Sequence, residues 1–161
     1  MIKRDANRTL AALAALYPVV AMTGPRQSGK STLARAAFPA KPYLSLEDLD
    51  VRDFADNDPR GFLAQFSDGA VLDEVQRCPA LLSYLQGMVD ANPRPGRFIL
   101  TGSQQFGLLS GISQSLAGRV GLLQLLPFSL AEVSIAATPT SLEELLFTGL
   151  YPPVHDRGLP P

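Results

Sequence analysis

The run from Gly24 to Thr32, GPRQSGKST, constrains the fold of this chain more than any other segment. It places four residues between two glycines and follows the second glycine directly with Lys and Ser, which matches the phosphate-binding P-loop pattern at every position. Such a loop turns backbone N–H groups inward around an anion, and its glycines adopt backbone angles that a Cβ would forbid. The pattern carries this meaning when a buried strand precedes the loop and a helix follows it.

Both flanks of the loop meet this condition. Residues 19–22 form an apolar, β-branched run that predicts a buried strand, and residues 31–38 have apolar side chains at helical spacing before a proline. We therefore expect a nucleoside triphosphate as ligand, with Lys30 neutralising the β- and γ-phosphates and the Ser31 hydroxyl on Mg²⁺. The residues expected to surround the phosphates are Gly24, Pro25, Arg26, Gln27, Ser28, Gly29, Lys30, Ser31 and Thr32.

Short apolar segments alternate with helical patterns along the rest of the chain. Further strands are predicted at 43–46, 70–72, 98–101 and 120–126, and further helices within 1–17 and at 49–54, 59–66, 79–92 and 108–116. Residues 47–66 carry many carboxylates and are expected to form a surface layer. This order predicts an α/β fold, with a mainly parallel five-stranded sheet covered by helices on both faces, followed by a helical end at 127–150.

The composition indicates one soluble domain without an electrostatic signal for nucleic acid. The 161 residues are 46% hydrophobic and have a formal net charge of −1, so the basic residues Lys3, Arg4, Arg94 and Arg97 are expected to be solvated. The single cysteine, Cys78, is expected to be a small buried side chain, which is typical of a cytoplasmic protein. No apolar run approaches the roughly 18 to 20 residues that span a bilayer.

Polar residues follow two of the predicted strands. In parallel sheets ligands bind at the carboxyl ends of the strands, so these residues are expected to converge on the P-loop. Asp73 is expected to reach Mg²⁺, directly or through a coordinated water, and Glu74 to polarise the water that attacks the γ-phosphate. Ser103 is the first candidate to contact the γ-phosphate or to orient that water, and Gln104 is the second.

Arg119 precedes the fifth predicted strand. A guanidinium can stabilise charge on a transferred phosphoryl group, in cis or on a neighbouring subunit, and the alternative is an ion pair with a surface carboxylate. Ser129 with Glu132, and Ser141 with Glu144, have the spacing of helix capping boxes.

These motifs together resemble one family, the AAA-type P-loop ATPase domain of prokaryotic proteins that join this module to a C-terminal domain of unknown function. The resemblance is carried by the P-loop and by residues 43–47, 72–76, 99–103, 115–119 and 126–129, and it covers residues 1 to about 150. It implies the strand order 5-1-4-3-2, with the strand bearing Ser103 between the P-loop strand and the strand bearing Asp73. Against that family, the Pro-rich residues 151–161 are expected to begin a C-terminal domain that is missing here, and the alternative is a domain that works alone.

Three functions are compatible with these residues. The first is Mg²⁺-dependent ATP hydrolysis coupled to a conformational change of an attached or partner domain. The second is a nucleotide-dependent binding switch with little turnover, and the third is a small-molecule kinase, which the lack of an evident arginine-rich lid disfavours. ATP is favoured over GTP because no Asn/Thr-Lys-x-Asp run follows the fourth strand. Self-association and nucleic-acid involvement are left open.

Overall fold

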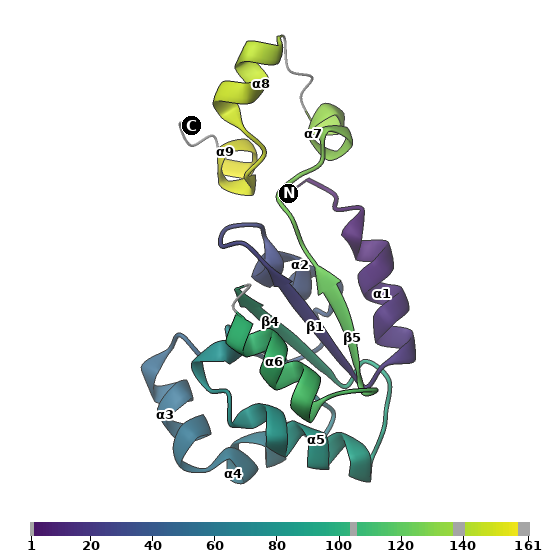
Figure 1. The fold of residues 1–161 in the computed structure, drawn as a ribbon, viewed down its shortest axis with the longest axis vertical. Coiled ribbons are helices and arrows are strands. Elements are labelled where there is room, and N and C mark those ends of the chain that lie inside the picture. The colour runs from purple at the N-terminus through teal and green to yellow at the C-terminus, as the bar shows by residue number, and fades with distance from the viewer. Residues whose placement is uncertain (1, 104–105, 137–140, 158–161) are drawn as a thin grey trace.

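The computed structural model, which describes residues 2–103, 106–136 and 141–157, is an α/β sandwich built on one parallel sheet (Figure 1). The strands are β1 (Val19–Gly24), β2 (Tyr43–Ser45), β3 (Val71–Asp73), β4 (Phe98–Ser103) and β5 (Val120–Gln124). Every neighbouring pair is parallel, and the order across the sheet is β2-β3-β4-β1-β5. The predicted fold class and the strand order implied by the resemblance are both confirmed.

The helices alternate with the strands and then form a terminal lobe. They are α1 (Ala6–Leu16), α2 (Lys30–Ala37), α3 (Leu49–Asn57), α4 (Pro59–Ala64), α5 (Leu81–Ala91), α6 (Phe106–Ser115), α7 (Leu130–Ala136), α8 (Leu142–Thr148) and α9 (Pro152–Arg157), with a 3-10 turn η1 at Val75–Arg77. In Figure 1 the helices α7, α8 and α9 lie beyond the carboxyl ends of the central strands. Among the described helices, none combines the length and the hydropathy that a membrane-spanning helix requires.

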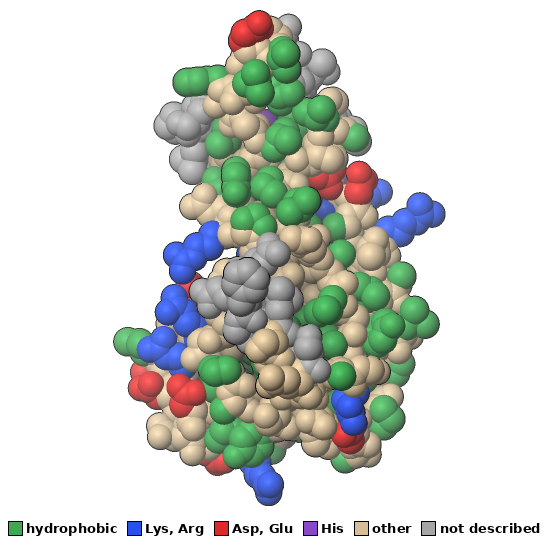
Figure 2. All heavy atoms as spheres, in the orientation of Figure 1, with side chains coloured by type: hydrophobic (Ala, Val, Ile, Leu, Met, Phe, Trp, Pro, Cys, Tyr) green, Lys and Arg blue, Asp and Glu red, His purple; other side chains and the backbone are tan. Residues whose placement is uncertain are grey.

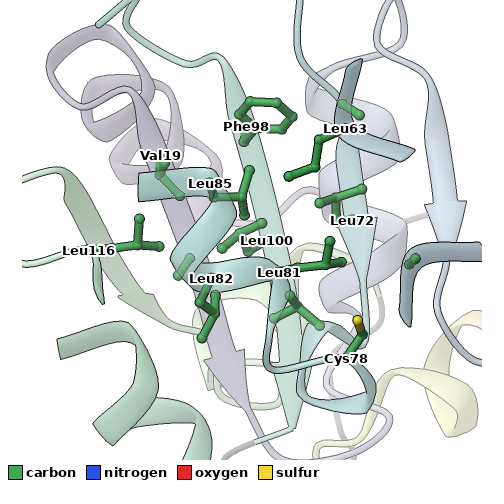
Figure 3. Packing of buried hydrophobic residues seen from close by; sticks show 14 of the residues in the cluster. Val19, Leu63, Leu72, Cys78, Leu81, Leu82, Leu85, Phe98, Leu100 and Leu116 are labelled. Carbon is green, nitrogen blue, oxygen red and sulfur yellow. The ribbon is translucent and has the colours of Figure 1, made fainter. Parts of the chain in front are cut away.

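Alternation along β1 explains the three layers. Side chains on a strand point to opposite faces in turn, and here Val19 and Ala21 pack into one core cluster while Val20 and Met22 pack into the other. The first cluster includes α5 residues, and Figure 3 shows Leu82 and Leu85 near Val19 and Leu100. The second cluster packs against α1 and α2. A strand buried on both faces must be apolar throughout, which is why β1 reads as a continuous hydrophobic run.

The acidic segment 47–66 contributes to the core, so its prediction as a surface layer is wrong in part. Phe62 and Leu63 of α4 are both buried in the first cluster, with 2% of their surface exposed. The Phe62 ring makes edge contacts with Phe54 and Phe66 at centroid distances of 5.7 and 5.5 Å. A single apolar turn between charged residues is too short to show a period, so the sequence pattern does not reveal this burial.

Arg97 is buried, against the prediction that it is solvated. It has 6% of its surface exposed, and it donates hydrogen bonds to the carbonyl oxygens of Ser67 (3.2 Å), Met88 (2.9 Å) and Asn92 (3.2 Å). A guanidinium has five N–H donors, so loop carbonyls can satisfy it away from water. Arg94 lies at the surface as expected and pairs with Asp68 at 2.9 Å.

Cys78 is a fully buried member of the first core cluster, as predicted (Figure 3). Burial raises the pKa of its thiol to about 12, and a hydrogen bond and the negative charge of Asp56 add to the shift. A thiol that stays protonated at neutral pH is a poor nucleophile. Cys78 therefore serves as a small packing residue.

The lobe of α7, α8 and α9 packs apart from the sheet core. Phe128 and Val133 are buried there but lie outside both core clusters. Figure 2 shows hydrophobic side chains gathered over this lobe. The large apolar side chains that are exposed within it are Leu130, Leu142, Leu146, Phe147 and Tyr151.

Candidate functional site

The P-loop joins the carboxyl end of β1 to the first turn of α2. Both of its glycines have positive φ angles, +149° at Gly24 and +91° at Gly29, and a Cβ at Gly24 would lie 2.1 Å from the carbonyl oxygen of Leu125. Residues with a side chain would strain the loop at both positions. The loop and the N-terminal end of α2, with its free N–H groups and positive dipole end, together form a site suited to an anion.

Lys30, the first residue of α2, folds back over the loop. Its Nζ atom donates hydrogen bonds to the carbonyl oxygens of Gly24 (3.1 Å) and Pro25 (2.7 Å). Burial lowers the pKa of this ammonium group, and the charges of Glu74 and Asp73 oppose that shift. Neutral carbonyls are weaker partners for an ammonium than phosphate oxygens, so a phosphate chain in the loop would gain the stronger hydrogen bonds.

Asp73 ends β3 at the centre of a cluster of hydroxyl groups. Ser31 Oγ donates to Oδ1 at 2.8 Å and lies 3.0 Å from Oδ2, Tyr43 donates its hydroxyl to Oδ2 at 2.6 Å, and the Thr101 hydroxyl donates to Oδ1. Burial, followed by the hydrogen bond to Asp73, raises the pKa of the Tyr43 hydroxyl. The structure thus brings together Ser31 and Asp73, which the sequence places in separate motifs. Sequence reasoning missed Tyr43, which it identified only as a strand residue.

The contact between Ser31 and Asp73 fits a magnesium ion shared with a nucleotide. Mg²⁺ prefers oxygen ligands and in nucleotide sites is held by one or two carboxylates together with phosphates and water. Among the described residues, no group of three or more His, Cys, Asp or Glu side chains could hold a metal alone. The Ser31 hydroxyl and the Asp73 carboxylate are oxygen donors of the kind that would hold Mg²⁺ together with a nucleotide.

Glu74 and Ser103 are connected through a third residue, Gln76. Glu74 has the left-handed angles φ 56° and ψ 45°, which residues with a side chain adopt rarely. Its backbone N–H donates to Thr101 Oγ1 at 3.3 Å, and its carboxylate accepts a hydrogen bond from Nε2 of Gln76. The same nitrogen donates to Ser103 Oγ at 3.0 Å. One amide thus joins two predicted site residues, Glu74 directly after β3 and Ser103 at the end of β4, while Gln104 lies outside the described residues.

Arg119 does not join this cluster. It pairs with Asp90, with 2.9 Å between Nη2 and Oδ2, and this ion pair holds the pKa of Asp90 below its usual value. The register Val19↔Val120 puts Arg119 at the amino end of β1, on the order of 20 Å from the P-loop by strand length. Within its own chain, therefore, Arg119 forms an ion pair with a surface carboxylate and does not reach the P-loop. A role of Arg119 toward a neighbouring subunit stays a prediction.

The P-loop faces a cleft of about 700 Å³, a size typical of ligand sites. One wall consists of P-loop residues with Glu47 and Glu74, and the other comes from α9, which forms within the Pro-rich tail. A second cavity of about 270 Å³ adjoins Gly29 and Thr32 and has a mixed lining. Its apolar side is formed by Ile2, Leu33, Ala36, Phe128 and Pro152, and its polar side by Lys3, Arg4, Asn7 and Asp156.

Arg4 ties the N-terminal segment to the P-loop, so its prediction as a solvated residue is wrong. Its side chain is only 9% exposed, and it donates to the carbonyl oxygens of Ser28 (2.8 Å) and Leu126 (2.7 Å). It also pairs with Glu132 at 3.1 Å and lies 4.7 Å from the centroid of the Phe128 ring. The planar guanidinium explains the burial, because its fork reaches acceptors on several segments at once.

Glu132 completes this buried pair and caps α7. Its backbone N–H donates to Ser129 Oγ (3.2 Å) while its carboxylate accepts from the backbone N–H groups of Ser129 (2.8 Å) and Asp5 (2.7 Å), which confirms the first predicted capping box. Burial alone would raise the pKa of Glu132, but these backbone N–H groups and the Arg4 guanidinium lower it below the ordinary value of a glutamate. In the second predicted box, Glu144 N–H donates to Ser141 Oγ at 3.1 Å.

We expect Glu132→Gln to lower the free energy of unfolding at pH 7 by about 1–3 kcal/mol, because the charge-assisted hydrogen bonds are lost. A carboxyl group whose pKa is lowered by folding stabilises the protein above its unfolded-state pKa, here 4.5, and loses that contribution as the pH falls through the folded value. The difference between the two proteins should therefore shrink below about pH 5. Urea unfolding at several pH values measures it, with the exposed Glu47→Gln as control. A difference that does not change with pH would contradict the assignment.

Comparison with known proteins shows similarity over most of the chain. The family described as "AAA domain" matches residues 16–134. Two curated mycobacterial proteins, uncharacterized protein Rv2008c of Mycobacterium tuberculosis and uncharacterized protein Mb2031c of Mycobacterium bovis, are each 35% identical over 154 residues. The match takes in 94% of this chain and 34% of each relative, so the chain spans about a third of their length.

Solved structures share the fold at low sequence identity. The Walker-type ATPase PABY2304 of Pyrococcus abyssi aligns with a TM-score of 0.66 and 18% identity, covering 94% of this chain and 65% of that chain. AMPPCP-bound DnaA from Aquifex aeolicus aligns with a TM-score of 0.58 and 17% identity, covering 98% and 61%. Similarity at this level establishes the architecture.

Proposed function

Because the chain belongs to the AAA domain family and is an AAA-type P-loop ATPase domain, we propose that it binds ATP with Mg²⁺ and hydrolyses the bond between the β- and γ-phosphates. The observation that most supports this proposal is the cluster at the carboxyl edge of the sheet. There Ser31 donates a hydrogen bond to Asp73, and Gln76 bridges Glu74 and Ser103. The Lys30 ammonium group lies over the neighbouring P-loop.

The nucleotide is assigned to the two adjoining cavities. The phosphates would lie in the 700 Å³ cleft, where the P-loop N–H groups and the N-terminal end of α2 favour anions. The base would take the 270 Å³ cavity, where Leu33, Ala36 and Phe128 offer apolar surface to a flat ring and Asn7 offers a polar group at its edge. Mg²⁺, held by Ser31 and Asp73 together with the phosphates, would supply neutralising charge at the β- and γ-oxygens.

Glu74 is assigned as the group that accepts a proton during hydrolysis. A water oxygen attacks the γ-phosphorus, the bond to the bridging oxygen of the β-phosphate breaks with its electron pair leaving on ADP, and the water proton passes to Glu74. The products are ADP and inorganic phosphate, and Glu74 then releases the proton to solvent. Ser103 is assigned to donate a hydrogen bond to an oxygen of the γ-phosphate.

Coupling of the nucleotide to the terminal lobe is the next part of the proposal. Helix α9 lines both cavities through Pro152 and Asp156, and the backbone N–H of Ile2 donates to Asp156 Oδ1 at 3.2 Å. A ligand in either cavity would contact this helix. We therefore assign α9 as the coupling element. A bound nucleotide would shift the position of α9, and through α9 the conformation of an attached or bound partner domain.

Asp73→Asn tests the metal assignment. The substitution keeps the shape of the side chain but removes its charge, so we expect the Mg²⁺ concentration for half-maximal phosphate release from ATP to rise about tenfold or more. The electron paramagnetic resonance spectrum of Mn²⁺ added with ATP provides a readout that does not depend on turnover. Glu47→Gln, a carboxylate on the cleft wall outside the Asp73 cluster, is the matched control. Equal metal dependence of Asp73→Asn and the parent would refute the assignment.

A further inference from the structure

We propose that Gln76 is a positioning residue for the two side chains assigned to face the γ-phosphate. Its amide leaves Ser103 free to donate a hydrogen bond and Glu74 free to accept one. This inference rests on the proposed function, because it concerns the same reaction. It adds a residue to which the sequence motifs assign no role. Its basis is one side-chain amide that contacts both groups.

The donor atoms decide what each contacted group can still do. The Nε2 atom of Gln76 carries two hydrogens, and it donates one to Glu74 Oε2 and one to Ser103 Oγ. Since Ser103 Oγ accepts here, its own hydrogen is available for donation to a phosphate oxygen. Since Glu74 is bound through Oε2, its other oxygen is available to accept the proton of a water. One amide thus prepares a donor and an acceptor side by side.

The orientation of the amide follows from its partners. An ionised carboxylate only accepts hydrogen bonds, so the nitrogen of Gln76, and not its oxygen, must face Glu74. The oxygen Oε1 of Gln76 is then buried and has no hydrogen-bond partner among the described residues. The described hydrogen bonds of this amide are therefore the two that Nε2 makes, to Glu74 and to Ser103.

The backbone explains how Gln76 reaches both residues. The left-handed conformation of Glu74 turns the chain sharply at the end of β3 into the η1 turn, and the Gln76 side chain returns to Glu74 two residues earlier. The neighbouring strand β4 runs parallel to β3 with Leu72 opposite Leu100, which brings Ser103 to the same edge of the sheet. Glu74 lines the cleft, whereas Gln76 is not among the described residues of its lining. Gln76 is thus placed to act through its two neighbours rather than on the nucleotide.

Gln76→Met is the sharpest test, because methionine nearly matches glutamine in size and has no N–H donor. We expect kcat for phosphate release to fall about 10- to 100-fold, while the Kd for a non-hydrolysable ATP analogue stays within about threefold of the parent value. Gln76→Glu, which keeps the shape but places a carboxylate against Glu74, should lose at least as much. Gln65→Met, at an exposed glutamine after α4, is the matched control and should leave both constants unchanged.

A double-mutant cycle with Ser103→Ala separates positioning from a general structural effect. If Gln76 acts partly through Ser103, the double variant should lose less in kcat than the product of the two single losses. Independent, multiplied losses, or a Gln76→Met protein as fast as the parent or faster, would overturn the inference while leaving the proposed function intact. A parent that releases no more phosphate than Glu74→Gln would instead refute the proposed function, and this inference with it.

Discussion

Lys30→Ala is expected to weaken the binding of MgATP by about 10- to 150-fold, the range that corresponds to losing a charge-assisted hydrogen bond of about 1.5–3 kcal/mol. The same change should cost the nucleotide-free protein little stability. Burial already disfavours the charge of Lys30, whose only hydrogen bonds in this structure among the described residues go to the neutral carbonyls of Gly24 and Pro25. The ammonium group is thus held in place for an anion more than for the fold.

Two measurements separate these effects. Calorimetric titration with a non-hydrolysable ATP analogue gives the affinity, and thermal unfolding with and without the analogue gives the stabilisation that binding confers. Lys41→Ala is the matched control, because burial also lowers the pKa of Lys41, which donates to the carbonyl oxygens of Asp68 and Arg97 away from the P-loop. Equal loss of ATP-induced stabilisation in both variants would contradict a specific role for Lys30.

Glu74→Gln is expected to reduce kcat for ATP hydrolysis by about 10²- to 10⁴-fold, the usual contribution of a positioned proton acceptor. Glutamine keeps the length of the side chain but cannot take the proton of the attacking water. Binding of ATP should persist, because the contacts assigned to the phosphates come from the P-loop, α2 and Ser103 and none comes from Glu74. Phosphate release under single-turnover conditions measures the chemical step, and filter retention of labelled ATP measures binding.

The outcome of this experiment also separates the three functions. If the parent and Glu74→Gln both bind ATP with the same negligible turnover, the chain is a nucleotide-dependent switch. If phosphate passes from ATP to a metabolite and not to water, the kinase alternative holds. Glu47→Gln, whose carboxylate lines the same cleft, is the control for a change of charge alone.

Much of this fold can be predicted because its signals are local. The strand before the P-loop, the turn of the loop and the helix after it are each encoded within a few residues, and the positive φ angles of Gly24 and Gly29 are what the glycines predict. The capping box of Ser129 and Glu132 is equally local, and both of its hydrogen bonds form. By contrast, the burial of Phe62 depends on packing between distant segments, so periodicity missed it.

The part of the candidate site that could be predicted consists of reactive side chains at the carboxyl ends of strands. Asp73 and Glu74 stand directly after an apolar run, and the rule that parallel strands bind ligands at their carboxyl ends places them beside the P-loop. Arg119 failed as a cis candidate on the same rule, because it precedes its strand and so lies at the opposite edge. Strand polarity, which can be read from the sequence, therefore places Arg119 away from the P-loop of its own chain.

Residue type and short spacing are enough to predict the P-loop, the alternation of strands and helices, and the carboxylates at the strand ends. The side chains that support these features are apparent only in the folded chain. Strand register brings Tyr43 to Asp73, and the left-handed turn at Glu74 brings Gln76 between Glu74 and Ser103. The path of the N-terminal segment brings Arg4 to the carbonyl oxygen of Ser28. Hydrogen bonds depend on distances of a few tenths of an ångström, and such distances follow from packing rather than from sequence spacing.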